Sequence, residues 1–215
     1  MNDYIIVLHK IQDGVSLFED VWYNLIEIYL QGGIMKIYLI RHGEDDSSFR
    51  GGWSNLGLTE NGIIQSKELA KKLKNFYNIN KIISSDLIRA KQTANIINSE
   101  LNVEIEYTDK LREMNNGLLA GMKNDVAERK FPGIYFNPLD MNEKFPGGES
   151  PAEFYERIVN GFNCIVNENA NIDNLALVTH GGVIGIIYAY VNRLEWSNKN
   201  KIIKVGCCEI IEIER

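Results

Sequence analysis

Residues Lys36–Glu44 read Lys-Ile-Tyr-Leu-Ile-Arg-His-Gly-Glu, and the rest of the chain is interpreted around this stretch. The apolar run Ile37–Ile40 is rich in β-branched and aromatic side chains, which predicts a buried strand. The run ends at Arg41, His42 and Gly43. Because open α/β sheets place their chemistry at the carboxyl ends of strands, the Arg-His pair is a candidate site. The glycine that follows lets the backbone approach a ligand closely.

Composition and charge narrow the class of protein. The 215 residues are 45% hydrophobic and 24% charged, which is typical of a globular domain that buries a core. No apolar run reaches membrane-spanning length, and the N-terminus lacks the features of a signal peptide. The net charge of −6 argues against a nucleic-acid partner. Cys164, Cys207 and Cys208 have no disulfide or zinc spacing, which indicates reduced thiols. We therefore expect a cytoplasmic protein that binds neither membranes nor nucleic acids.

Candidate strands alternate with candidate helices along the chain. Thr59, Asp86 and Ser150 are the expected N-caps of three of these helices. Apolar runs predict further strands over 81–84, 103–107 and 175–179, and two strands within 202–214 that turn near Gly206. Helical periodicity predicts helices over 59–76, 86–101, 123–130, 150–166 and 183–191. This order predicts an α/β three-layer sandwich, with a mostly parallel central sheet, an antiparallel edge strand and helices on both faces.

Four stretches, taken in order, carry a family pattern. They are Leu39-Ile40-Arg41-His42-Gly43-Glu44, Ser85–Ala94, Leu111-Arg112-Glu113 with Gly117 and Gly121, and Leu177-Val178-Thr179-His180-Gly181-Gly182. Together they resemble the histidine phosphatase superfamily, the fold that also contains cofactor-dependent phosphoglycerate mutase. Residues 58–62 and 146–150 resemble further landmarks of this family. The resemblance implies a histidine phosphatase-like catalytic domain over residues 35–215.

The resemblance also implies roles for individual residues. His42 matches the family nucleophile, a neutral imidazole that attacks phosphorus and forms a phosphohistidine. Arg41 and Arg89 match arginines that clamp phosphate, for which the planar, permanently charged guanidinium is suited. His180 matches the second histidine, which stabilises charge on a nonbridging oxygen. Glu113 matches the general acid that protonates the leaving group. Another branch of the family has its acid directly after the second histidine, where this chain has a glycine.

The loop after the nucleophile departs from the family pattern. Asp45 stands where the family often has Thr or Ser, and Asp46 follows it. Two carboxylates at the mouth of a pocket predict repulsion of a second anionic group on the substrate. Ser48 stands where the family has an asparagine that helps to hold phosphate. The phosphate-binding residues that we expect are therefore Arg41, Arg89, His180, Ser48 and Gly181.

The stretch between Glu113 and Pro146 is compact, which favours hydrolysis over mutase activity. A mutase needs a closed site that keeps its bisphosphorylated intermediate from water. The sequence therefore predicts a phosphomonoester hydrolase that acts on a small phosphorylated metabolite without a cofactor or a metal. The alternatives are a phosphoglycerate-type mutase and a phospholigand-binding pseudoenzyme. A metal site formed by His42, His180 and Asp45 has no ligand spacing to support it. The natural substrate and the oligomeric state, a homodimer included, stay open.

Residues 1–34 lie outside the resemblance. Ser16 and Glu19 form a capping-box pattern, and apolar residues follow at helical spacing, which indicates an accessory helix. Met35 directly precedes the first strand. Residues 31–34 can be encoded by DNA that contains AGGAGG, which looks like a bacterial ribosome-binding site. We expect residues 1–34 to be an N-terminal extension, either from a mis-set start site or as a helix that docks on the body or on a second subunit.

Overall fold

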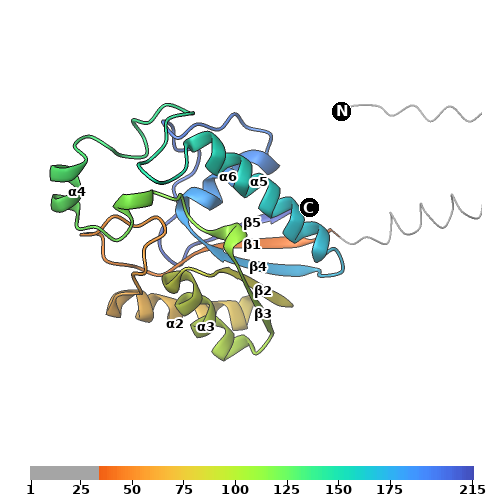
Figure 1. Ribbon diagram of the computed structural model, residues 1–215. Helices are drawn as coiled ribbons and strands as arrows, with labels where there is room; N and C mark the ends of the chain where they lie inside the picture. The colour runs from red at the N-terminus through yellow and green to blue at the C-terminus, as the bar shows by residue number, and fades with distance from the viewer. Residues whose placement is uncertain (1–33) are drawn as a thin grey trace, which may run out of the picture. The chain divides into compact units, whose positions relative to one another are not determined.

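Residues 34–215, which the computed structural model describes, contain one five-stranded sheet covered by helices (Figure 1). The spatial order of the strands is β3-β2-β4-β1-β5, and all neighbours are parallel except β1 and β5. The strands are β1 (Lys36–Arg41), β2 (Lys81–Ser85), β3 (Glu104–Thr108), β4 (Asn174–Thr179) and β5 (Ile210–Glu214). The predicted mostly parallel sheet with an antiparallel edge strand is confirmed. The expectations for the N-terminal extension concern residues 1–33, which lie outside the described residues.

Helices pack on both faces of the sheet, which confirms the three-layer prediction (Figure 1). Ile37 and Leu39 of β1 belong to the buried cluster on the face that α5 and α6 cover, whereas Tyr38 and Ile40 belong to the cluster under α2 and α3. This alternation is the period of two that a strand imposes on its side chains. The helices are α2 (Glu60–Phe76), α3 (Ile88–Leu101), α4 (Asn124–Lys130), α5 (Pro151–Glu168) and α6 (Gly181–Val191). None of the described helices is long and apolar enough to cross a membrane.

Two of the three predicted helix caps are present. Thr59 accepts a hydrogen bond from the Gly62 amide, and Ser150 with Glu153 forms a complete capping box at the start of α5. The prediction for Asp86 is wrong, because α3 begins at Ile88 and has no side-chain cap. The Asp86 carboxylate instead accepts from Nε of Arg112 at 2.6 Å. A charge-assisted bond to a guanidinium has displaced the weaker capping bond.

The C-terminal segment differs from the prediction of two strands. Only residues 210–214 form a strand, and residues 202–206 run as a loop. Residues 202–206 belong to no strand of the described sheet, and their Val205 carbonyl accepts a hydrogen bond from Arg41. Residues 196–206, which we call the distal loop, instead contribute to a cavity described below.

The sheet topology brings two distant motifs together. β1 lies beside β4, with Arg41 opposite Thr179 in the register. The amide of His42 donates to the Thr179 carbonyl at 2.9 Å, so the chain continues in register for one residue beyond the strand. The carboxyl ends of both strands therefore present His42 and His180 at the same edge of the sheet.

Candidate active site

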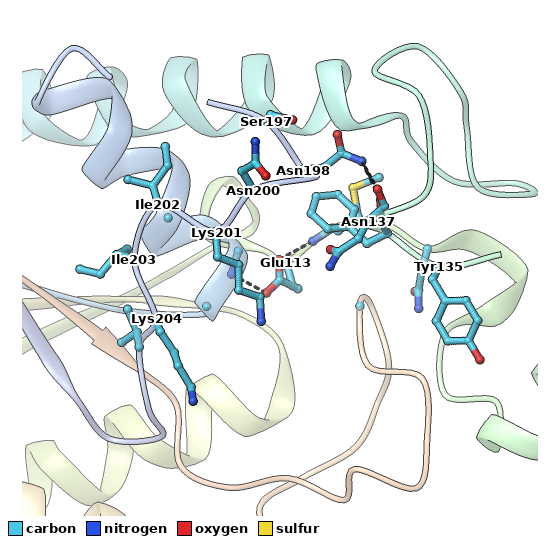
Figure 2. A pocket seen from close by; sticks show the side chains of 18 of the residues that line it. Glu113, Tyr135, Asn137, Ser197, Asn198, Asn200, Lys201, Ile202, Ile203 and Lys204 are labelled. Atoms are coloured by element: carbon cyan, nitrogen blue, oxygen red, sulfur yellow. Dashed lines mark hydrogen bonds between the residues drawn. The ribbon is translucent and has the colours of Figure 1, made fainter. Parts of the chain in front are cut away.

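A cavity of about 520 Å³ lies where β1 ends and α6 begins. Arg41, His42, Glu113 and Gly181 line it together with the distal loop, and Figure 2 shows Glu113 beside the labelled residues of that loop. The edge at the carboxyl ends of the parallel strands is where open α/β sheets bind their ligands. The residues that the sequence singled out are thus gathered at this edge, with the exceptions described below.

His42 is held in one tautomer. Its Nδ1 lies 2.7 Å from the Gly43 carbonyl, which can only accept, so Nδ1 carries the proton. Nε2 is left with its lone pair, and it accepts from Nε of Arg89 at 3.1 Å. The side chain is 4% exposed, and burial, followed by the charge of Arg89, lowers its pKa to about 3. The ring is therefore neutral at physiological pH, with Nε2 as its nucleophilic atom.

Arg89 is buried and anchored from three sides. Its Nη2 donates to the Gly52 carbonyl at 2.9 Å, and its Nη1 donates to the Ser54 hydroxyl at 3.3 Å. The Asp45 carboxylate lies 3.5 Å from Nε of the same guanidinium. Burial lowers the pKa of Arg89, and the charge of Asp45 opposes this effect. The guanidinium is thus fixed next to Nε2 of His42, where an incoming phosphoryl group would lie.

His180 faces the nucleophile across the strand ends. The centroids of the two histidine rings are 5.1 Å apart, and His180 is fully buried. Its Nε2 lies 2.9 Å from the Ser85 hydroxyl, whose oxygen accepts from the Leu87 amide. When this hydroxyl donates to Nε2, the ring proton lies on Nδ1. Nδ1 is buried and has no partner among residues 34–215. Burial and the nearby arginines lower the pKa of His180 well below its ordinary value.

Arg41 and Gly181 form the wall next to the nucleophile. Nη1 of Arg41 donates to the Val205 carbonyl at 2.8 Å, while its Nε is buried without a hydrogen-bond partner in the described part of the chain. Gly181 is the first residue of α6 and packs against the Arg41 side chain. The N-terminus of α6 adds its own attraction for an anion. Both residues lie where the sequence predicted them, at the phosphate end of the cavity.

Glu113 is fixed through both its side chain and its backbone. Its carboxylate accepts from the Met114 amide at 2.9 Å and from the Gly182 amide at 3.1 Å. A Cβ at Gly182 would lie 2.4 Å from Oε1 of Glu113, so this approach requires glycine. The Glu113 carbonyl accepts from Nε1 of Trp53 at 2.7 Å and from Nη2 of Arg157 at 3.1 Å. These contacts hold the carboxylate at the cavity wall.

Ser48, which we expected to bind phosphate, is not among the residues that line the cavity. Arg89 and His180 are not either, but both lie against His42, Arg89 through its bond to Nε2 and His180 through the ring contact. Ser48 is exposed, and its hydroxyl donates to Oδ1 of Asp46 at 2.7 Å, while its carbonyl accepts from the Asn124 amide. Oδ1 of Asp46 accepts from both the amide and the hydroxyl of Ser48, and the Asp45 carboxylate is paired with Arg89. Neither carboxylate is among the residues that line the cavity, although Asp45 lies next to the Arg89 guanidinium that contacts His42. The repulsion of a second anionic group on the substrate stays a prediction.

The metal site weighed from the sequence, with His42, His180 and Asp45 as ligands, does not form. In the described range 34–215, no three His, Cys, Asp or Glu side chains are grouped to hold a metal ion.

Arg50 and Asn116 line the cavity and were missed by the sequence reasoning. Arg50 stacks on the Tyr135 ring, 3.9 Å from its centroid, and two of its nitrogen atoms are buried without a hydrogen bond within residues 34–215. Asn116 is 7% exposed, and its Oδ1 has no partner in the same range. A signal existed only for Asn116, which lies inside the quoted motif between Glu113 and Gly117.

The comparisons with known proteins agree with this geometry. A sequence model of the histidine phosphatase superfamily (branch 1) matches residues 37–215. The protein named "Probable phosphoglycerate mutase GpmB" of Erwinia tasmaniensis is 27% identical over 186 residues, which cover 84% of this chain and 85% of that protein. A broad-specificity phosphatase of Saccharomyces cerevisiae is 29% identical over 182 residues, which cover 79% of this chain and 75% of that protein. The crystal structure of the alpha-ribazole phosphatase from Shigella flexneri superposes with a TM-score of 0.67 at 25% identity, over 75% of this chain and 81% of that one. The chain therefore belongs to the histidine phosphatase superfamily, branch 1.

Proposed function

We propose that the protein is a cytoplasmic phosphomonoester hydrolase, which transfers the phosphoryl group of a small metabolite to Nε2 of His42 and then to water. The observation that carries this proposal is the state of His42. Its Nδ1 is committed to the Gly43 carbonyl, and its Nε2 keeps a lone pair beside Arg89. A role in packing or in phosphate binding alone requires neither a fixed tautomer nor a neutral ring at this place.

In the first step, Nε2 of His42 attacks phosphorus while the bond from phosphorus to the ester oxygen breaks. Nε of Arg89, which donates to Nε2 in the free protein, moves its donation to a phosphoryl oxygen. Its bonds to Gly52 and Ser54 hold the guanidinium in place during this exchange. The unpartnered Nε of Arg41 and Nδ1 of His180 supply two further donors for the nonbridging oxygens.

Glu113 completes both steps through proton transfer. Its protonated carboxyl gives a proton to the departing alkoxide in the first step. In the second step the carboxylate takes a proton from water, the water oxygen bonds to phosphorus, and the bond from phosphorus to Nε2 of His42 breaks. Inorganic phosphate leaves and His42 returns to its neutral state. The amides of Met114 and Gly182 keep the carboxylate in position throughout.

A phosphoglycerate-type mutase is the second candidate, because several relatives carry such a name. The two reactions share the phosphohistidine and differ in the group that accepts the phosphoryl. In a mutase the acceptor is a hydroxyl of the substrate. Incubation with 3-phosphoglycerate separates the two, because a hydrolase releases inorganic phosphate and a mutase yields 2-phosphoglycerate.

The test of the proposed function is phosphate release from a panel of phosphomonoesters, which includes sugar phosphates, phosphoserine, nucleoside monophosphates and aryl phosphates. We expect turnover by the full chain in the presence of a chelator, and loss of that turnover in His42→Asn. Lys74→Gln, an exposed change on α2, is the matched control and should retain the wild-type rate. Turnover that survives His42→Asn would overturn the proposal.

A further inference from the structure

The cavity extends well beyond the space that a phosphoryl group fills. Its volume of about 520 Å³ lies within the range of pockets that enclose ligands larger than a small sugar phosphate. Beyond Glu113 apolar and aromatic side chains alternate with polar ones, among them Asn137, Ser197 and Asn200. The apolar and aromatic residues are Leu119, Ile134, Phe136, Phe145, Trp196, Ile202 and Ile203. The alcohol part of the substrate therefore meets apolar side chains once the phosphoryl group is in place.

The charged side chains that the distal loop contributes to the cavity are cationic. Lys201 and Lys204 line the cavity, and Figure 2 shows both extending from the distal loop on the side where Glu113 lies. Arg50 also lines the cavity but is engaged by Glu128 and Tyr135. No ion pair within residues 34–215 includes Lys201 or Lys204. Glu113 is the one acidic residue among those that line the cavity in this range.

The distal loop is anchored on both sides of these lysines. On one side Asn198 is 4% exposed, and its Nδ2 donates to the carbonyls of Phe136 and Leu139 at 2.7 and 2.8 Å. On the other side the Val205 carbonyl accepts from Arg41. The backbone of the two lysines is thus positioned relative to the phosphate end, which reduces the entropy lost when a ligand binds.

We propose that the substrate is a phosphomonoester whose alcohol part has an apolar surface and ends in a second anionic group, which Lys201 and Lys204 bind. This inference rests on the proposed function and adds the class of substrate to it. It is opposite to the preference for neutral or cationic substrates that Asp45 and Asp46 suggested. The two lysines are among the residues that line the cavity and the two carboxylates are not, and the experiment below decides between the two preferences.

The test compares three aryl phosphates with similar leaving groups: 4-(carboxymethyl)phenyl, 4-ethylphenyl and 4-(2-aminoethyl)phenyl phosphate. We expect kcat/KM of the full chain to be highest for the carboxylate, roughly 3- to 30-fold above the ethyl ester, as two partly exposed ion pairs would give. The amine should be the poorest substrate. The preference should weaken in about 0.5 M NaCl because salt screens the lysines.

The matched variants are Lys201→Gln with Lys204→Gln, and Lys199→Gln as the control. Lys199 is in the same loop but is paired with Asp140 and does not line the cavity. The double variant should hydrolyse the carboxylate and ethyl esters at similar kcat/KM, while the control keeps the wild-type ratio. Equal rates for the three esters, or a preference that survives in the double variant, would overturn the inference while the proposed function stands.

Failure to hydrolyse any of the three esters would count against the proposed function. In that case the binding of non-hydrolysable analogues tests the inference. Calorimetry with 4-(carboxymethyl)benzylphosphonate and 4-ethylbenzylphosphonate needs no turnover. Tighter binding of the carboxylate by wild type, lost in the double variant, supports the anion subsite. Equal affinity of the two phosphonates contradicts it.

Discussion

The two ends of the cavity are built in different ways. At the phosphate end, His42, Arg89 and His180 are at most 4% exposed, and each stands where a strand ends or a helix begins. Their polar atoms bond to backbone or to neighbouring side chains, so their positions follow from the sheet. In the distal loop, Lys201 and Lys204 are exposed, and the loop is held by the bonds of Asn198 to the carbonyls of Phe136 and Leu139 and by the bond of Arg41 to the Val205 carbonyl. We therefore expect the strand ends of the sheet to position the residues of the reaction, and the distal loop to determine which substrates bind.

The largest effect that sharpens this contrast is expected from Glu113→Gln. Removal of the general acid should slow the hydrolysis of alkyl phosphates by roughly 10²–10⁴-fold. The loss should be much smaller with 4-nitrophenyl phosphate, because its leaving group needs no proton. Steady-state rates on both substrates measure the difference, with Glu100→Gln on the exposed side of α3 as the control. Equal losses on the two substrates would mean that Glu113 only positions other groups.

A second prediction concerns the free energy of unfolding that is lost at low pH because His42 is buried in its neutral form. The folded pKa of His42 is about 3, below the ordinary value of 6.5 that it regains on unfolding. Between these values the unfolded chain binds a proton that the folded chain does not, so the free energy of unfolding falls as the pH falls. From pH 7 to pH 5, His42 alone should reduce it by about 2 kcal/mol.

Urea unfolding of wild type and His42→Asn at the two pH values measures this term. The variant should lose about 2 kcal/mol less than wild type over the same interval. Lys199→Gln, at the distal end, should show the wild-type dependence on pH. Identical pH dependence in His42→Asn and wild type would show that the buried ring is not kept neutral at the expense of stability.

The smallest effect is expected at the distal end, from Trp196→Ala. Trp196 stacks near Tyr155, with 5.3 Å between the ring centroids, and lines the cavity. Its loss should raise KM for an aryl phosphate by roughly 2- to 10-fold, the value of one aromatic contact. The value of kcat and the kinetics with a small alkyl phosphate should stay close to wild type. A large fall in kcat for both substrates would mean that the two ends do not act separately.

The sequence was sufficient for the phosphate end because that end depends on local patterns. Apolar runs predicted the strands, and the capping-box pattern at Ser150 predicted the start of α5. The residues of interest follow strand ends, so the parallel pairing of β1 and β4 was enough to bring His42 and His180 together. The position of such a motif in the fold therefore follows from the strand that precedes it.

The errors lie where tertiary contacts override local preference. Asp86 fits the pattern of an N-cap, but Arg112, distant in sequence, takes its carboxylate. Asp45 looks like a surface acid and is instead drawn to the buried Arg89. The second half of the distal loop has the apolar sequence of a strand, but its Ile202 and Ile203 line the cavity and do not join the sheet. None of these contacts has a signal in the local sequence.

The most direct test of the account is to find which atom carries the phosphoryl group. The full chain is mixed with a ³²P-labelled aryl phosphate and quenched in alkali within the first turnovers, and the labelled peptide is identified. We expect an acid-labile, base-stable label on His42 that is absent from His42→Ala and present in Lys199→Gln. A label that persists in His42→Ala, or one that lies on His180, would contradict the central claim.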